Sequence, residues 1–398
     1  MLAVVNARIH TCGPGGTIDG GTVLVQNGKI AAVGTGVGIP DQAETIDARG
    51  MVMTPGFVDA HTHMGMSWQE LAGEADTNES TGVVNAHLRA IDSVDPKDIA
   101  FGDAVEAGAT TVMIHPGKLM VWRQTISPIA GQSVVMKTHG KMARREILRE
   151  PAGMKMAFGD AVAEFLTSRN IGPNSRMGIV GLVRGVLHEA QQYRDKGRGN
   201  GSGDRDLKLE ALSLVLSRQI PAHVHVHRAD DILTVLRLGQ EFGIDLVLEH
   251  ATEGHLVVEA LAESGVPCVV GPITRARSSR AMRELQNLSQ KTPGILAAAG
   301  VKVALMTDHP TEPIQFLPII AGEAAREGMV PEEALKAITI NAAEIMGVAD
   351  RVGSIEVGKD ADLVVHDGDP LEAMTRIRLV VADGQVVVDS LRQGKENA

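Results

Sequence analysis

Residues 55–65 read PGFVDAHTHMG, an apolar segment that runs into His61 and His63 and then breaks at a glycine. Side chains two positions apart on a strand point to the same face, so the two imidazoles project together. If this strand belongs to a parallel barrel, its carboxyl end lies at the mouth where active sites form. Two imidazoles supply half of a zinc-type ligand set. The segment therefore predicts a buried strand that ends in a metal site.

The chain beyond this segment alternates between strand-like and helix-like patterns from about residue 92 to residue 346. Apolar runs of strand length recur at 110–114, 134–138, 223–227, 246–250, 267–271 and 301–307. Helical patterns lie between them, for example at 229–243 and 332–346. This alternation predicts an α/β fold with a parallel sheet buried on both faces. The length favours a (β/α)8 TIM-type barrel over a doubly wound sheet.

Both ends of the chain have a different pattern. Residues 1–54 and 349–398 contain short alternating strands with turn signals, such as the Asn27-Gly28 pair of a hairpin. We expect these two segments to build one small β-sandwich domain. Residues 55–348 are then expected to form the barrel.

The composition argues against several classes of protein. With a net charge of -11 and 2% aromatic residues, the chain lacks the basic, stacking surface of a nucleic-acid binder. Its two cysteines, Cys12 and Cys268, cannot form a disulfide framework. No segment resembles a signal peptide or a transmembrane helix. We therefore expect a cytoplasmic protein with a small-molecule partner, with no nucleic acid or membrane involved, and we leave homo-oligomer formation open.

A second cluster of histidines lies at HVHVH, residues 223–227. His223, His225 and His227 occupy alternate positions of one strand, so all three face the same way. Three imidazoles in a dry interior are costly unless they have partners. This strand therefore predicts either a ligand position or a hydrogen-bonded histidine cluster inside the barrel.

Two further strand ends carry polar groups. His250 ends the apolar strand LVLEH, and His255 lies just beyond it. Asp308 follows the apolar strand at 301–307 and is itself followed by His309 and Pro310. A carboxylate at the carboxyl end of a barrel strand is typical of a ligand or a general base. Together with the first strand and the HVHVH strand, these segments bring four histidines and one aspartate to one rim.

These motifs carry a family resemblance that covers almost the whole chain. PGFVDAHTH, VHVHRADD, LEHATEGH, MTDHP and the tail ITINAAEIMGVADRVGSIEVGKDADLVV resemble the amidohydrolase superfamily. Within it, the sequence is similar to the imidazolonepropionase-like branch, which includes Xaa-Pro dipeptidase-like enzymes. The resemblance implies a metal-dependent hydrolase with one or two divalent ions, zinc first and other divalent metals as alternatives.

The resemblance also implies the ligands, which are His61, His63, His225, His250 and Asp308. Binuclear relatives add a carboxylated lysine that bridges two metals. Lys155, inside the apolar segment GMKMAFG, is the first candidate for that bridge, and Lys137 is the second. A site with neither lysine is the third option, and either lysine could instead hold a substrate carboxylate.

The implied reaction is cleavage of an amide-type C–N bond in a dipeptide, an N-acyl amino acid or a cyclic amide. A metal-bound hydroxide attacks, and Asp308 serves as general base and then as acid. A histidine outside the ligand set, His227 or His255, would stabilise the oxyanion.

Three residues are candidates for binding the substrate. Arg228 suits a carboxylate through its planar fork, and the alternative for it is an ion pair with Asp230 or Asp231. Lys137 and His139 complete the substrate-binding candidates.

Two other functions fit the same motifs. The first is a mononuclear aminohydrolase, a deaminase or an imidazolone-type ring hydrolase, acting on a small heterocycle. The second is a catalytically inactive barrel that serves as a scaffold. Scaffolds of this kind lose metal ligands, whereas every ligand position is filled in this sequence.

Overall fold

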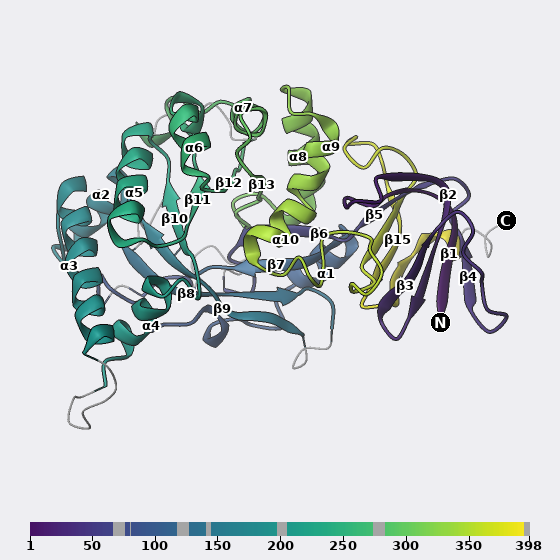
Figure 1. Ribbon diagram of the computed structural model, residues 1–398, viewed down its shortest axis with the longest axis horizontal. Coiled ribbons are helices and arrows are strands. Elements are labelled where there is room, and N and C mark those ends of the chain that lie inside the picture. The colour runs from purple at the N-terminus through teal and green to yellow at the C-terminus, as the bar shows by residue number, and fades with distance from the viewer. Residues whose placement is uncertain are drawn as a thin grey trace.

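The computed structural model describes residues 1–66, 76–79, 81–117, 127–140, 145–196, 205–273 and 283–393. They form two sheets, a barrel-type sheet surrounded by helices and a second sheet at one side of it (Figure 1). The strands of the barrel sheet are β6 (Phe57–Thr62), β7 (Ala109–Ile114), β8 (Ile129–Lys137), β9 (Ile147–Ala157), β10 (Ala222–Val226), β11 (Leu246–His250), β12 (Cys268–Val270) and β13 (Val303–Leu305). They pair in sequence order, which is the arrangement of an α/β TIM-type barrel.

The two ends of this sheet meet. His63 donates its backbone N–H to the carbonyl of His309 at 2.9 Å, and Asp308 donates to the carbonyl of His61 at 3.2 Å. These bonds connect the end of β6 to the segment just after β13. They bring the first and last predicted ligand segments side by side.

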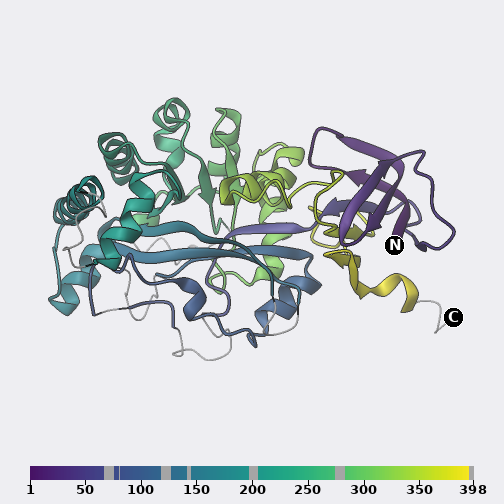
Figure 2. The same ribbon diagram turned by 60° about the horizontal axis from the view of Figure 1, so that its bottom comes forward.

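The expectation of an all-parallel sheet is wrong at β8. This strand runs antiparallel to both neighbours, β7 and β9, while the other neighbouring pairs from β6 to β13 are parallel. A connection of only nine residues, 138–146, joins β8 to β9. Antiparallel neighbours need no crossover helix, so the long strands β8 and β9 lie side by side with helices beyond them (Figure 2).

The helices follow the apolar periodicity of the sequence. The α-helices are α1 (Ala100–Glu106), α2 (Asp160–Arg169), α3 (Arg176–Asp195), α4 (Leu207–Leu216), α5 (Ala229–Phe242), α6 (Val258–Ser264), α7 (Thr292–Ala298), α8 (Leu317–Arg326), α9 (Pro331–Ala337), α10 (Ile340–Met346) and α11 (Ser390–Gln393). Short 3-10 turns are η1 (Ala90–Asp92), η3 (Gly254–Leu256), η5 (Arg283–Leu285) and η6 (Ile314–Phe316). In α5, Ile232, Val235 and Leu236 are buried, and the helix ends at Gly243, whose φ of 62° is the left-handed conformation that glycine adopts readily.

The single helix expected over 332–346 is two helices, α9 and α10. The break falls at Ile338 and Thr339. The carbonyl of Ile338 accepts a hydrogen bond from the backbone of Val58 at 2.8 Å, and the Thr339 hydroxyl donates to the carbonyl of Leu335 at 2.7 Å. At the break, the carbonyl of Ile338 therefore binds strand β6 instead of continuing the hydrogen-bond pattern of a helix.

The second sheet joins the two ends of the chain. Its strands are β1 (Leu2–His10), β2 (Thr17–Gln26), β3 (Lys29–Gly34), β4 (Glu44–Asp47), β5 (Val52–Pro55), β14 (Leu363–His366), β15 (Ile377–Ala382) and β16 (Gln385–Asp389). They lie in the order β16-β15-β14-β5-β1-β2-β3, with β4 beside β1. The early and late strands are the purple and yellow ones beside each other in Figure 1.

Beside α10, the barrel interior at the amino end is apolar, whereas the carboxyl end carries a cluster of polar side chains. Val58, Val247 and Ala304 pack there against α10, so this helix closes the amino end. The polar groups of the site therefore gather at the other end. Among the described residues, no helix is both long and apolar enough to cross a membrane.

Candidate active site

The first group of polar side chains at the carboxyl end consists of His61, His63 and Asp308. The Nε2 atoms of the two histidines lie 3.4 Å apart. Asp308 Oδ1 is 3.6 Å from His61 Nε2 and 3.3 Å from His63 Nε2. All three residues are buried. Three potential ligand atoms thus lie within 4.8 Å of one another, which is a spacing that a metal ion can use.

Hydrogen bonds of Asp59 connect the two segments that carry these three residues. Asp59 accepts hydrogen bonds from the His61 N–H at 3.1 Å and from the Thr307 hydroxyl at 2.6 Å, which holds β6 beside the segment after β13. Burial raises the pKa of Asp59 to about 7. His250 and Asp308 have positive φ values of 68° and 53°. Such strained backbone in non-glycine residues is common at functional sites.

A second group consists of His225, His227 and His250, whose ligand atoms also lie within 4.8 Å of one another. The ring centroids of His225 and His250 are 4.3 Å apart, and those of His61 and His250 are 5.4 Å apart, so the two groups adjoin. Nε2 of His225 is buried and has no hydrogen-bond partner in the described part of the chain. A buried imidazole nitrogen without a hydrogen-bond partner is suited to binding a cation.

Hydrogen bonds fix the tautomers of two of these histidines. His63 donates from Nδ1 to the carbonyl of His115 at 2.7 Å, and His250 donates from Nδ1 to the carbonyl of Gly271 at 2.8 Å. A carbonyl can only accept, so the proton is on Nδ1, and Nε2 of the neutral ring carries a lone pair. This is the arrangement in which a histidine binds a metal.

The site favours neutral imidazoles. Burial lowers the pKa of His61 and of His225 well below the ordinary value, and nearby positive groups add to the effect. The contacts between His61 and Asp308 are therefore not an ion pair. Metal binding requires deprotonated ligands, and this environment supplies them near neutral pH.

A deeper layer of polar groups was missed by the sequence analysis. Glu249 on β11 is completely buried and contacts Lys155 Nζ on β9. His223 Nδ1 donates to Glu249 at 2.9 Å, and His115 Nε2 lies 3.2 Å from the same carboxylate. The available signal was a charged residue at the fourth position of the otherwise apolar strand LVLEH, where a buried charge needs partners.

Lys137 and His139 lie far from these groups. Because β8 is antiparallel, its carboxyl end points to the amino end of the barrel, where Lys137 pairs in register with Thr111 near the start of β7. Lys137 Nζ is 2.7 Å from Asp362 and 2.8 Å from Asp383. Lys137, the second candidate for the bridge, therefore does not lie with the ligands. His139, two residues further along the chain, does not lie with them either.

The remaining predicted residues are divided between the site and its rim. His227 joins the second group and binds the Thr252 hydroxyl through Nδ1 at 2.7 Å. His255 belongs to neither the first nor the second group, and its Nδ1 lies 2.9 Å from the Thr292 hydroxyl. Arg228 forms a two-pronged ion pair with Asp230 at 2.9 and 3.0 Å, which is the alternative that the sequence left open.

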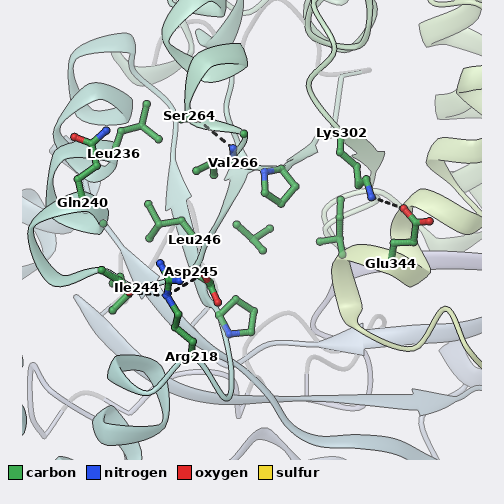
Figure 3. Close-up of a pocket in the computed structure, with 17 residues that line it drawn as sticks. Arg218, Leu236, Gln240, Ile244, Asp245, Leu246, Ser264, Val266, Lys302 and Glu344 are labelled. Atoms are coloured by element: carbon green, nitrogen blue, oxygen red, sulfur yellow. Dashed lines mark hydrogen bonds and ion pairs between the residues drawn. The ribbon is translucent and has the colours of Figure 1, made fainter.

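A separate hollow of about 680 Å³ lies at the amino ends of β10, β11 and β12. Figure 3 shows Arg218 beside Asp245 on one side and Lys302 beside Glu344 on the other. In each of these two ion pairs, the distance between the nitrogen and the oxygen is 3.4 Å or less, so the positive and negative charges compensate each other. The hollow lies at the amino ends of these strands and the histidines lie at the carboxyl ends, so the hollow is not part of the site described above.

The sequence model described as "Amidohydrolase family" matches residues 52–387. The chain belongs to the amidohydrolase family. This amidohydrolase is 28% identical over 382 residues to the amidohydrolase TasK of Hapsidospora irregularis, an alignment that covers 88% of this chain and 38% of TasK. It is 28% identical over 431 residues to the imidazolonepropionase of Shouchella clausii, covering 94% of this chain and 87% of the relative.

A solved structure of similar shape is that of an amidohydrolase from Thermotoga maritima MSB8. It is 39% identical, has a TM-score of 0.91, and the match covers 98% of this chain and 100% of that one. The expected imidazolonepropionase-like branch of the superfamily is confirmed. This amidohydrolase is a metal-dependent hydrolase that acts on C–N bonds.

Proposed function

We propose that this amidohydrolase cleaves an amide-type C–N bond in a small molecule, with dipeptides, N-acyl amino acids and cyclic amides as the substrate class. The observation that carries the proposal is the meeting of His61, His63 and Asp308 within 4.8 Å, next to the orphaned Nε2 of His225. Zinc is the proposed metal, because the donors are imidazole nitrogens and a carboxylate oxygen.

The ligand set that we propose is His61, His63, His225, His250 and Asp308. These residues would hold a divalent ion, which would supply a bound water of lowered pKa and polarisation of a substrate carbonyl. Buried imidazoles whose Nδ1 is held by a carbonyl keep their ring planes fixed, so the site is preorganised before substrate arrives.

Asp308 and His227 would do the proton chemistry and the charge stabilisation. Asp308 takes a proton from the attacking water and delivers it to the leaving nitrogen, as a carboxylate next to two imidazoles can. Nδ1 of His227 lies 2.7 Å from the Thr252 hydroxyl, and with this hydroxyl as the donor, Nε2 of His227 carries the proton that it can donate to the developing oxyanion.

One observation favours a second candidate, a mononuclear aminohydrolase or imidazolone-type ring hydrolase on a heterocycle. Lys155 Nζ contacts the buried carboxylate of Glu249. A carbamate on Lys155 would set a second negative charge against Glu249, which opposes its formation. We therefore leave Lys155 out of the ligand set.

Metal counting by elemental mass spectrometry, followed by a substrate panel, tests both candidates. The panel contains dipeptides, N-acyl amino acids, cyclic amides and aminoheterocycles, with amine or ammonia release as the readout. Asp308→Asn should lower the turnover of any active substrate by about 10²–10⁴-fold. Asp362→Asn, a buried carboxylate at the far end of the barrel, is the matched control and should keep turnover unchanged. A protein that retains no metal and rejects added zinc contradicts both candidates.

A further inference from the structure

Glu253 lies in the segment that follows strand β11, three residues beyond the proposed ligand His250, and its side chain is buried. Its Oε2 accepts a hydrogen bond from the backbone N–H of Ala229 at 2.8 Å, and its Oε1 accepts one from Asn287 Nδ2 at 2.8 Å. Ala229 begins helix α5 after strand β10, and Asn287 follows strand β12. One carboxylate thus connects the segments that follow three consecutive barrel strands.

The first turn of helix α5 is held by this carboxylate. The first N–H groups of a helix have no acceptor within the helix. Arg228, the residue before α5, makes no capping hydrogen bond with its side chain. Glu253 supplies such an acceptor from another segment, and its negative charge is favourable at the positive end of the helix dipole. The start of α5 is therefore tied to the segment after β11.

The same segment also binds His227. The backbone N–H of Glu253 donates to the carbonyl of His227 at 2.8 Å, and Nδ1 of His227 lies 2.7 Å from the Thr252 hydroxyl. With the bond from Ala229 to the Glu253 side chain, three hydrogen bonds join residues 252–253 to residues 227–229. Because His227 is only two residues from Ala229, a shift of Ala229 would also move His227.

Both partners of the Glu253 side chain are donors, so this position needs a group that accepts through both of its ends. An ionised carboxylate accepts through both oxygens, whereas a glutamine side chain has one accepting oxygen and one donating NH2 group. Glu253→Gln would therefore set an NH2 group against either the N–H of Ala229 or the amide of Asn287. One of the two connections would be lost.

We propose that Glu253 is a positioning residue, one that holds residues 227–229 and thereby places the ring of His227 beside the metal ligands. The inference rests on the proposed function, in which His227 stabilises the developing oxyanion. The ring centroid of His227 lies 4.7 Å from those of both His225 and His250. Misplacing a group in an active site by about 1 Å can lower the rate about 10²-fold. The loss should appear in kcat, because the oxyanion charge develops only in the transition state.

The first test follows the His227 ring directly, by NMR of protein labelled with 15N-histidine. The signal that is missing in His227→Gln identifies this ring, and it should shift or broaden in Glu253→Gln. Glu323→Gln is the matched control. Glu323 likewise accepts a hydrogen bond from a side-chain amide, that of Gln290 at 2.7 Å, but it lies on α8, so the His227 signal should stay as in the wild type.

Ala229→Pro provides a second variant in case Glu253→Gln does not fold. It removes the N–H that Glu253 binds and leaves the carboxylate in place. Proline is well tolerated at the first position of a helix, and the preceding Arg228 has the extended conformation that a residue before proline prefers. The His227 signal should shift in this variant as well.

Turnover of the panel substrate that the wild type cleaves fastest is the second readout. Glu253→Gln and Ala229→Pro should each lower kcat about 10²-fold with little change in KM. In a protein that already carries His227→Gln, neither substitution should lower kcat much further, because substitutions that act through one residue are not additive.

An unchanged His227 signal in the folded variants overturns the inference, and so does a loss of kcat that adds in full to the loss in His227→Gln. If the signal shifts but His227→Gln retains the wild-type kcat, Glu253 does position the ring and the proposed role of His227 fails. A wild type that cleaves no member of the panel contradicts the proposed function, while the NMR spectra still decide whether Glu253 positions His227. The two failures are thereby distinguished.

Discussion

The two ends of the barrel each bury a lysine in an apolar strand, and the two lysines have opposite surroundings. At the amino end, Lys137 lies within 3.1 Å of three aspartates, Asp360, Asp362 and Asp383. Burial lowers its pKa, but these carboxylates outweigh burial and raise the pKa above the ordinary value. On the side of the ligands, Lys155 contacts a single carboxylate, and burial lowers its pKa to about 7.

The comparison shows that a buried lysine is not by itself a mark of an active site. Lys137 is a permanent cation that ties strand β8 to the segments around β14 and β15, so it belongs to the architecture. Lys155 lies among histidines and can change its protonation near neutral pH. The charged groups around each lysine in space distinguish the structural role of Lys137 from that of Lys155. The apolar residues next to each lysine in the sequence do not distinguish them.

The largest expected effect is on stability at the amino end. Lys137→Met leaves three buried carboxylates without their cation, and we expect the free energy of unfolding to fall by about 3–5 kcal/mol. Urea unfolding monitored by circular dichroism measures this decrease in the free energy of unfolding. Asp383→Asn, which removes the most exposed of the three carboxylates, is the control and should cost less. A loss below about 1 kcal/mol for Lys137→Met would contradict the comparison.

Lys155→Met should lower the free energy of unfolding by less than Lys137→Met does. It leaves one carboxylate that still has His223 as a donor, so we expect a loss of about 1–3 kcal/mol. The measurement is the same urea titration on chelator-treated protein, which separates folding from metal binding. Equal losses for the two lysine variants would remove the distinction between the two ends.

Lowering the pH should destabilise the sheet side of the molecule through His366. This residue is buried on β14, where Nε2 lies 3.1 Å from the Thr54 hydroxyl, and burial lowers its pKa to about 3. The unfolded chain then binds a proton at higher pH than the folded one, so stability is full above about pH 6.5 and declines toward pH 3. One proton contributes at most about 1.4 kcal/mol per pH unit. Unfolding measured across this range should show a shallower slope for His366→Gln.

The smallest effect is expected at the rim. Arg228→Gln removes an ion pair with the half-exposed Asp230, and pairs of this kind contribute about 0–1 kcal/mol. The midpoint temperature of thermal unfolding should therefore change by only a few degrees. If this variant instead raises the KM for carboxylate-bearing substrates in the panel, Arg228 also binds substrate, as the sequence first suggested.

Much of the barrel could be predicted from the sequence because apolar runs and polar strand ends are local signals. His61, His63, His225, His250 and Asp308 were each placed at or just after a strand, and the structure gathers them. The direction of β8 could not be predicted, because an apolar run looks the same in either orientation. The position of Lys137 depended on that direction. Glu249 was overlooked because its partners, Lys155 on β9 and His223 on β10, come from other strands.

The pairing of β5 with β14 has a consequence for the synthesis of the protein. Pro55 of β5 lies in register with Leu363 of β14, so a strand translated early must wait for one translated more than 300 residues later. At ribosomal speeds of about 5–20 residues per second, the delay is roughly 15–60 s. Throughout this time β5 presents an open edge that other nascent chains can pair with. Rapid chain elongation, or a chaperone that covers this edge, would therefore raise the yield of folded enzyme.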